Sequence, residues 1–323
     1  KPKMANSQEI TKRELISMKD RLGLEDLSNS LYFPKYFEIE TIRGCNAHCT
    51  MCTIQEWNNK NNKMDDYLFN KFLEEVSTYN KWVNRVCLSR NGEPLMDKTI
   101  AKKIYRLKDA GINYTMISTN ASLLNEKRAI EIIDSGLDDI RFSIDGVTKE
   151  TFEKIRNGLN YENVLENCLR FIGLRNSKGT KPIIQVRMVL QNENRDEEER
   201  FKEFWLSKVS NQDIVSSKSM NSWGNQLKTY ERPSSESEKY SDMPCISPWS
   251  TMVVHFDGAV PLCGCDYNNK ILMGDLNKNT IKDIWQSKNF EEIRKKHASG
   301  KRNNIELCKG CNIWDPEIKK VYD

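Results

Sequence analysis

The sequence has no hydrophobic run approaching the roughly 20 residues that a membrane-spanning helix needs. Hydrophobic residues make up only 38% of its 323 positions, so we expect no association with a membrane. The opening KPKMANSQEITKRELISMKD is charged and lacks the apolar centre of a secretory signal. The sequence therefore predicts a soluble cytoplasmic protein, long enough for one large α/β domain or for a large and a small one.

A dominant charge of one sign is also missing. The chain has 50 Lys and Arg against 46 Asp and Glu, a net charge of +4, and the two signs are mixed along the sequence. Nucleic-acid-binding proteins usually gather basic residues into a patch or stripe. We therefore expect no nucleic-acid partner.

Cysteine is the residue that the chain does not lack, since it has 10. Thiols stay reduced in the cytoplasm, which favours metal binding or catalysis over disulfides. Three cysteines lie within RGCNAHCTMC, at residues 43–52, and five lie in the last quarter of the chain. Cys87 and Cys168 fall in a strand pattern and a helix pattern, and we expect both in the core.

From residue 36 onward, short β-rich runs alternate with longer helical stretches. Strands are expected at 36–42, 84–89, 114–118, 140–145, 183–190 and 213–220, and helices at 67–79, 97–110, 125–136, 162–175 and 197–209. Such alternation implies crossover connections and a parallel sheet. Six units are too few for a complete eight-fold barrel, so the predicted fold class is α/β, with a partial TIM-like (β/α)6 barrel.

The expected domains are an N-terminal extension (1–35), the partial barrel (36–226), a linker (227–244) and a small C-terminal domain (245–323). The linker loses apolar periodicity and is rich in Ser, Glu and Lys. In the C-terminal domain, two alternating runs around Asp257-Gly258 predict a β-hairpin. An amphipathic helix over 280–300 and a CKGC turn at 308–311 follow.

The first three cysteines have the spacing C-x3-C-x2-C directly after the first strand, where β/α folds present their active-site loops. Three thiols do not complete a tetrahedral zinc site, and His48 would bend the loop awkwardly as a fourth ligand. On a [4Fe-4S] cluster, three thiolates would leave one iron open. This arrangement resembles the radical S-adenosylmethionine (radical SAM) superfamily, in which SAM chelates that iron. The resemblance implies that Cys45, Cys49 and Cys52 hold the cluster and that SAM cleavage yields a 5'-deoxyadenosyl radical.

Further segments carry the same resemblance. NGEP (91–94) is similar to a Gly-Gly-Glu-Pro-like stretch that meets the methionine amine of SAM, STNAS (118–122) to a ribose-contacting segment, and SIDG (143–146) with FEKIRNG to a stretch that binds the SAM carboxylate. The implied SAM-binding residues are Asn91, Gly92, Glu93, Pro94, Ser118, Asn120, Ser143 and Arg156. Read singly, Asn120 suits a helix cap, Gly92 and Pro94 a turn, and Arg156 a solvated charge.

The second cysteine group comprises Cys245, Cys263, Cys265, Cys308 and Cys311, and its spacing alone suits a zinc ribbon. A hairpin, a helix and a C-x2-C turn after a radical SAM core resemble the SPASM/twitch extensions, which hold auxiliary [4Fe-4S] clusters. Similarity to the twitch-bearing 2-deoxy-scyllo-inosamine dehydrogenases implies one cluster on Cys245, Cys263, Cys308 and Cys311. Cys265 would share the strand face of Cys263, and we consider it as an alternative ligand, a catalytic hydrogen-atom donor or a buried thiol.

An auxiliary cluster with four protein ligands can accept an electron from a substrate radical. It favours dehydrogenation of a polar small molecule such as a sugar or aminocyclitol, with an external one-electron reductant such as flavodoxin or ferredoxin. The alternatives are radical epimerisation with Cys265 as hydrogen donor, peptide modification, for which the 35-residue extension is too short to be a peptide-recognition domain, and a non-enzymatic zinc-binding interaction protein. Glu38 with Glu40 and Gln185 with Arg187 would line the barrel, and NSWGNQ (221–226) would approach the active site.

Overall fold

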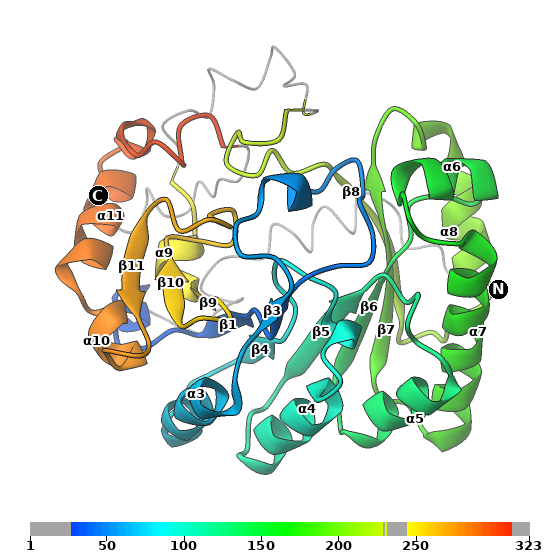
Figure 1. Cartoon of the computed structure of the whole chain (residues 1–323), viewed down its shortest axis with the longest axis horizontal. Helices are drawn as coiled ribbons and strands as arrows, with labels where there is room; N and C mark the ends of the chain where they lie inside the picture. Colours follow the sequence, from blue (N-terminus) through cyan, green and yellow to red (C-terminus); the bar gives the residue numbers. More distant parts are fainter. Residues whose placement is uncertain (1–26, 229, 231–243, 312–323) are drawn as a thin grey trace.

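The computed structural model describes residues 27–228, 230 and 244–311 (Figure 1). Most of the predicted N-terminal extension, most of the predicted linker and residues 312–323 lie outside the described residues. The described chain begins with the 3-10 helix η1 (Leu27–Leu31), which leads into the first strand.

A seven-stranded parallel sheet forms the centre of the molecule, in the order β8-β7-β6-β5-β4-β1-β9. Six of its strands are those predicted from the sequence. Their bounds are β1 (Tyr36–Ile39), β4 (Arg85–Cys87), β5 (Thr115–Thr119), β6 (Asp139–Ser143), β7 (Ile183–Leu190) and β8 (Ile214–Ser219). The parallel α/β architecture of a partial TIM-like barrel is thereby confirmed.

Helices cover the outer face of this sheet (Figure 1). They are α3 (Asp66–Thr78), α4 (Ile100–Asp109), α5 (Glu126–Asp134), α6 (Lys149–Ile155), α7 (Tyr161–Lys178) and α8 (Glu198–Leu206), of which α6 was not predicted. Asp65, Asn125 and Asn160 cap α3, α5 and α7 by accepting a backbone N–H at the third residue beyond. Within the described residues, no helix is long and apolar enough to cross a membrane.

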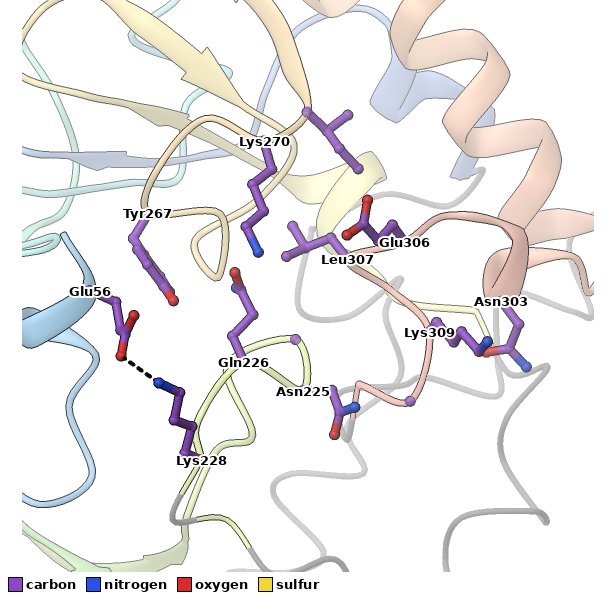
Figure 2. A pocket seen from close by; sticks show the side chains of 13 residues that line it. Glu56, Asn225, Gln226, Lys228, Tyr267, Lys270, Asn303, Glu306, Leu307 and Lys309 are labelled. Carbon is purple, nitrogen blue, oxygen red and sulfur yellow. Dashed lines mark ion pairs between the residues drawn. The ribbon is translucent and has the colours of Figure 1, made fainter. Parts of the chain in front are cut away.

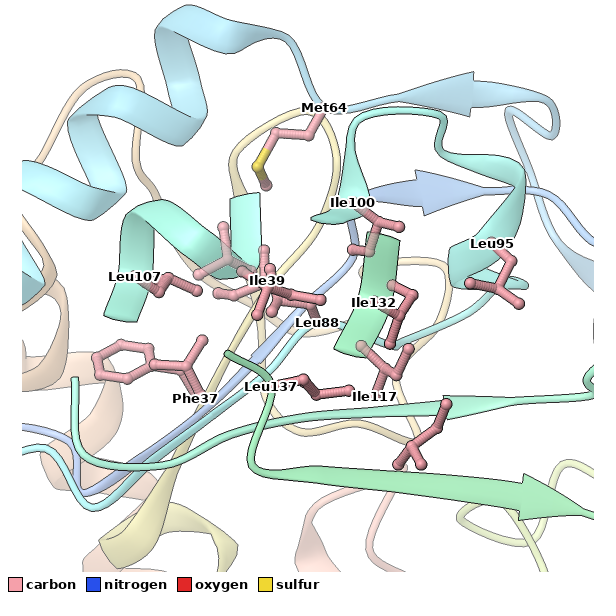
Figure 3. Close-up of a cluster of buried hydrophobic side chains, with 14 of the residues drawn as sticks. Phe37, Ile39, Met64, Leu88, Leu95, Ile100, Leu107, Ile117, Ile132 and Leu137 are labelled. Carbon is pink, nitrogen blue, oxygen red and sulfur yellow. The ribbon is translucent and has the colours of Figure 1, made fainter. Parts of the chain in front are cut away.

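The hydrophobic core fills the space between the helices and the outer face of the sheet. Figure 3 shows Phe37, Ile39 and Ile117 of the strands meeting Ile100 of α4 and Ile132 of α5. The opposite face of the sheet, here called the inner face, is polar because side chains alternate along each strand. This division leaves one face of the sheet free for chemistry.

Strands β6 and β7 show the division residue by residue. Phe142 is fully buried in the core, whereas its neighbours Arg141 and Ser143 are partly exposed on the inner face. On β7, Val186 is buried and Gln185 and Arg187 are partly exposed. Arg141 donates to Gln185 Oε1 at 3.2 Å across these two strands.

The predicted hairpin around Asp257–Gly258 was wrong in its first arm. Strand β9 (Thr251–Val254) pairs in parallel with β1 and becomes the seventh strand of the sheet. The tight turn does form, with His255 N donating to Ala259 O at 2.9 Å, but β10 (Ala259–Pro261) pairs with β11 (Leu272–Asp275) instead. Three successive buried residues, 252–254, explain the outcome, because a strand that buries both faces suits a covered parallel sheet.

The C-terminal part contains short helices packed beside this hairpin. They are α9 (Ser247–Ser250), α10 (Ile281–Trp285), α11 (Lys288–Ala298) and the 3-10 helix η5 (Arg302–Asn304). The single helix predicted over 280–300 is divided in two because Ser287 accepts from Phe290 N and caps α11.

Candidate active site

The first three cysteines lie in a loop of residues 44–61, here called the cysteine loop. The short antiparallel strands β2 (Ile42–Arg43) and β3 (Asn62–Lys63) close its base. Two backbone hydrogen bonds, from His48 N to Asn157 O at 2.8 Å and from Thr50 N to Ile155 O at 3.0 Å, hold it against the end of α6. The loop therefore sits at the carboxyl end of β1, where the sequence predicted it.

The thiols of this loop are suited to metal ligation rather than to a free thiolate. Burial raises the pKa of Cys45 to about 12 and that of Cys52 to about 11. Burial also raises the pKa of Cys49, against the charge of Arg156, whose Nη1 lies 3.7 Å from Cys49 Sγ. A bound cation would offset this cost of burial and keep the thiols deprotonated, and three soft sulfur donors fit an iron–sulfur cluster. His48 is exposed and lies 3.2 Å from Gln55 Nε2 through its Nδ1.

Position 92 requires glycine because the NGEP segment, residues 91–94, passes very close to the base of the cysteine loop. A Cβ at Gly92 would lie 2.3 Å from the carbonyl oxygen of Ile42 and 2.9 Å from that of Gly44. Glu93 N donates to the same Gly44 oxygen at 2.8 Å. Gly92 is thus more than a turn residue, because two backbones meet there. Pro94 follows as the first residue of η3 (Pro94–Met96).

The Glu93 carboxylate braces two of the predicted SAM-binding segments together. It accepts hydrogen bonds from Thr119 Oγ1 at 2.6 Å, Asn120 N at 2.8 Å and Leu95 N at 3.1 Å. Burial raises its pKa, against these donors. The observed role of Glu93 is to hold residues 118–122 beside the NGEP segment, and a contact of its side chain with SAM stays a prediction.

Asn120 and Arg156 both reach the cysteine loop. Asn120 Nδ2 lies 3.0 Å from Asn46 Oδ1 and 3.8 Å from Cys45 Sγ, and it does not cap α5, whose cap is Asn125. Arg156 forms a buried ion pair with Asp145, with Nη2 2.6 Å from Oδ2. Arg156 is therefore no solvated helix charge, and both side chains border the thiols.

Ser118 and Ser143 meet on the inner face below this loop. Their hydroxyl oxygens lie 3.3 Å apart, at the carboxyl ends of the adjacent strands β5 and β6. The structure thus gathers all eight predicted SAM-binding residues around the cysteine loop or on the adjoining strand ends. Their individual contacts with SAM stay predictions.

A buried polar cluster lies beneath the cysteine loop and was not predicted. It consists of Glu40, Arg43, Asn91 and His255, each no more than 5% exposed. Arg43 donates to both Glu40 carboxylate oxygens at 2.6 and 3.0 Å and lies 3.1 Å from His255 Nδ1. Asn91 Nδ2 donates to Glu40 at 2.8 Å. The cluster therefore ties the cysteine loop and the NGEP segment to the residue that follows β9.

Glu40 and Asn91 of this cluster make contacts that the sequence did not predict. Glu40 was expected to line the barrel beside Glu38, but it is fully buried because Arg43 provides a charged partner. Asn91, which replaces the first glycine of the family motif, has φ of 44°. Asparagine tolerates this left-handed region better than most residues, and its amide supplies the hydrogen bond to Glu40 that glycine lacks.

The ionisation of Glu40 predicts a pH-dependent stability. Burial, opposed by Arg43, raises the pKa of Glu40 from 4.5 to about 7. A carboxyl with a higher pKa in the folded chain contributes stability that is complete below its unfolded pKa and is lost as the pH rises through the folded value. Between about pH 4 and pH 8, the free energy of unfolding of the metal-free wild type should fall by about 3 kcal/mol relative to that of the Glu40→Gln variant.

Urea titrations at several pH values would measure this difference. Glu199→Gln, at an exposed position of α8, is the matched control and should follow the wild type throughout. Parallel stability curves for Glu40→Gln and the wild type would contradict the prediction.

The five C-terminal cysteines converge in the structure. Burial raises the pKa of Cys245 to about 12, and the charges of Cys311 and Cys263 add to this effect. Hydrogen bonds with Cys263 and Cys311, together with burial, raise the pKa of Cys265. Cys265 therefore belongs to the same thiol group, although the predicted strand was wrong: β10 ends at Pro261, and both Cys263 and Cys265 lie beyond it.

His297 is a member of this group that sequence reasoning missed. Its Nδ1 lies 3.1 Å from the donor Cys245 N, so Nδ1 accepts and Nε2 carries the ring proton. Nε2 can then donate to Cys308 Sγ, 3.5 Å away. Burial, followed by the charge of Arg302, lowers the pKa of His297 to about 4, so the ring is neutral at neutral pH. A hydrogen bond to a ligand sulfur is one of the means by which proteins tune iron–sulfur clusters.

The thiol group fits a multi-iron cluster, because thiolates are the usual ligands of such clusters and a four-iron cluster takes each thiolate on a different iron. Which four of the five thiols are ligands stays a prediction.

The cysteine loop and the C-terminal cysteines are joined by NSWGNQ, residues 221–226. Trp223 Nε1 donates to Met51 O at 3.0 Å, and Gln226 Nε2 donates to Cys265 O at 2.9 Å. The segment therefore touches both cysteine groups. With Tyr267 and Leu307 it also borders a pocket of about 650 Å³, shown in Figure 2.

Cys87 was expected in the core but lies on the inner face. Cys87 is buried, but its Sγ lies 3.2 Å from Ser89 Oγ, and its strand neighbour Val86 occupies the core instead. Cys168, by contrast, is a fully buried core residue as predicted. Glu38 also lies on the inner face, where it pairs with Arg90 at 3.0 Å.

Comparison with protein families agrees with this geometry. Residues 39–204 match the radical SAM superfamily. The chain belongs to this superfamily. Residues 245–312 match SPASM, an iron–sulfur cluster-binding domain. The predicted family and its cofactors, SAM and iron–sulfur clusters, are thereby confirmed, while the individual ligands stay predictions.

Among characterised relatives, an 83-residue stretch is 35% identical to the S-adenosyl-L-methionine-dependent 2-deoxy-scyllo-inosamine dehydrogenase of Niallia circulans, covering 26% of this chain and 33% of that protein. This radical SAM chain spans a third to a half of the length of the curated relatives it matches. GTP 3',8-cyclases are among those relatives.

Two solved structures show the same fold. BtrN in complex with AdoMet and 2-DOIA has a TM-score of 0.60 and 21% identity, covering 86% of this chain and 93% of that one. Streptococcus suis SuiB bound to the precursor peptide SuiA has a TM-score of 0.65 and 12% identity, covering 88% and 71%. At these identities the likeness concerns the fold of the superfamily.

Proposed function

We propose that this chain is a radical SAM dehydrogenase that oxidises a polar small molecule of the sugar or aminocyclitol class. The observation that carries the proposal is the convergence of five thiols, one buried and four half-buried, beside the inner face of the sheet. Four of them, Cys245, Cys263, Cys308 and Cys311, suffice to saturate an auxiliary [4Fe-4S] cluster. A saturated cluster has no position for substrate and is suited to electron transfer.

Oxidation of an alcohol carbon to a ketone removes one hydrogen atom, one proton and one electron from the substrate. When bound, SAM with its site-differentiated cluster supplies the radical that takes the hydrogen atom, and the auxiliary cluster supplies an acceptor for the electron. The residues of the chain bind and orient the reactants and keep water out. Arg156 and Asn120 fix the cysteine loop in this scheme, and Glu93 holds the segments expected around SAM.

The inner face supports a polar substrate. Hydrogen-bonding side chains from adjacent strands are presented there: Glu38, Arg90, Ser118, Arg141, Ser143, Gln185 and Arg187. Directed donors and acceptors of this kind recognise ring hydroxyl and amino groups. The similarity to a 2-deoxy-scyllo-inosamine dehydrogenase supports the same class. A soluble one-electron reductant and a cytoplasmic location complete the proposal.

The proposal is tested with 2-deoxy-scyllo-inosamine and a panel of related aminocyclitols and sugars. The reconstituted protein, SAM and dithionite should yield 5'-deoxyadenosine and a product lighter than its substrate by two hydrogens. Mass spectrometry distinguishes the alternatives, because epimerisation leaves the mass unchanged. Cleavage of SAM with no oxidised product from any member of the panel would count against the proposed class.

Replacement of Cys265 separates dehydrogenation from epimerisation. In the proposed reaction Cys265→Ala keeps about eight irons per chain and forms the oxidised product at close to the wild-type rate, because four ligand thiols are still present. Cys263→Ala, which removes a proposed ligand, should lose about four irons and the product with them. Iron analysis and product assays measure both effects. A Cys265→Ala enzyme that cleaves SAM without forming product would instead make Cys265 the hydrogen donor of an epimerase.

A further inference from the structure

Arg90 connects the inner face of the sheet with the auxiliary thiol group. It follows β4, and its Nη1 forms an ion pair with Glu38 Oε2 at 3.0 Å. Its Nη2 donates to the carbonyl oxygen of Gly264, the residue between Cys263 and Cys265. One guanidinium thus contacts both a carboxylate expected to face substrate and the backbone between two auxiliary thiols.

Gly264 is the residue that permits this contact. A Cβ at this position would lie 2.5 Å from Arg90 Cζ and 2.6 and 2.7 Å from its two terminal nitrogens. Burial lowers the pKa of Arg90, but the charges of Glu38, Cys265 and Cys263 raise it by more. Arg90 Nε is buried and has no hydrogen-bond partner within the described part of the chain.

Trp223 fixes Arg90 from the other side. The guanidinium lies over its ring, 5.3 Å from the centroid, and the indole N–H donates to Met51 O in the cysteine loop. Trp223 has φ of 52°, a conformation that is costly for a bulky residue and persists only where its surroundings hold it. The contacts Met51–Trp223–Arg90–Gly264 therefore join the two cysteine-bearing loops.

A fixed positive charge beside an iron–sulfur cluster favours its reduced, more negative state. The guanidinium is always protonated, so this effect does not depend on pH. Net charge and hydrogen bonding near the sulfurs are among the factors that set cluster potentials. A higher potential makes the auxiliary cluster a better electron acceptor.

We propose that Arg90 is a positioning residue that raises the reduction potential of the auxiliary cluster and places this electron acceptor against the substrate-facing Glu38. The inference rests on the proposed function in one respect only, namely that the electron accepted by the auxiliary cluster comes from the substrate. The potential itself is a property of the protein without SAM or substrate. It can therefore be measured even where no substrate is turned over.

The test uses the full chain with Cys45, Cys49 and Cys52 replaced by alanine, which should carry the auxiliary cluster alone. Redox titrations followed by electron paramagnetic resonance compare Arg90→Gln, Arg90→Lys and Gly264→Ala with this parent. At the midpoint potential of the parent, the reduced-to-oxidised ratio should fall on the order of tenfold in Arg90→Gln. Gly264→Ala should shift it the same way, because its methyl group displaces the guanidinium. Arg141→Gln, another inner-face arginine that pairs with Gln185, should leave it unchanged.

The outcomes separate this proposal from a structural role and from failure of the proposed function. Arg90→Lys keeps the charge and should lie between the parent and Arg90→Gln. An unchanged potential in a fully loaded Arg90→Gln protein would overturn the inference, and so would loss of the cluster from both Arg90→Gln and Arg90→Lys. Loading of Arg90→Lys but not of Arg90→Gln would support it. If the potential shifts but no aminocyclitol or sugar is oxidised, the proposed function fails and the role of Arg90 stands.

Discussion

Replacing Gly92 with alanine should reduce SAM cleavage by about a hundredfold. The new methyl group would lie 2.3 Å from Ile42 O and 2.9 Å from Gly44 O, both of which are backbone atoms at the base of the cysteine loop. To reach ordinary contact distances, the NGEP segment and the loop must separate by roughly 1 Å, and a misplacement of that size can cost about 10²-fold in rate. Formation of 5'-deoxyadenosine by the reconstituted protein measures the loss.

Gly173→Ala is the matched control. Gly173 lies within α7, and a Cβ there has no neighbour within 4 Å. This substitution should keep wild-type cleavage and stabilise the fold by about 0.5–1 kcal/mol, because alanine is the better helix former. Circular dichroism should show both variants folded. Equal cleavage by Gly92→Ala and Gly173→Ala would refute the close-approach account.

Replacing Cys49 with alanine should abolish SAM cleavage and remove about four irons per chain, because one of three thiols holding the first cluster is lost. The iron of the auxiliary group should be retained, since its thiols come from a separate part of the chain. Iron and sulfide analysis and the 5'-deoxyadenosine assay measure these two effects.

Cys87→Ala is the control for the loss of a thiol as such. Cys87 is buried on the inner face and belongs to neither cysteine group, so the variant should retain about eight irons. A Cys49→Ala protein that still cleaves SAM, or a Cys87→Ala protein that loses a cluster, would contradict the assignment of the first cysteine group.

Local patterns were enough to predict six of the seven strands of the sheet and the place of the first cysteine group at its edge. Each of the six predicted strands is a short β-rich run between helices, and parallel pairing brings their carboxyl ends to one edge. Because the cysteine loop, NGEP and residues 118–122 follow three of these strands, their proximity follows from the order of the motifs. The need for glycine at position 92 could not be predicted from the order of the motifs, since it depends on the carbonyl of Ile42 across the loop.

The rest of the site depends on contacts between distant residues. Arg90 meets Glu38 and Gly264, and His255 meets Arg43 and Asn91, although long stretches of chain separate these partners. Strand β9 looked like half of a hairpin because the Asp257–Gly258 turn is a strong local signal. Its pairing with β1 gains burial on both faces, which no local pattern around the turn discloses.

The roles of the last five cysteines also depend on contacts that local sequence patterns do not predict. Spacing indicated an auxiliary metal site, but it placed Cys265 on a strand that ends before it is reached. His297 gave no sequence signal, because one histidine within an amphipathic helix usually serves packing. Its link to Cys308 depends on the backbone N–H of Cys245, which fixes the ring tautomer.

Metal content decides whether one chain carries both a SAM-binding cluster and a separate auxiliary cluster. Anaerobic reconstitution of the wild type, followed by iron, sulfide and zinc analysis, should give about eight irons and about eight sulfides per chain. Addition of SAM should alter the electron paramagnetic resonance spectrum of the cluster on Cys45, Cys49 and Cys52 alone. A colourless protein containing zinc, or one with about four irons in total, would show that the chain does not carry two [4Fe-4S] clusters.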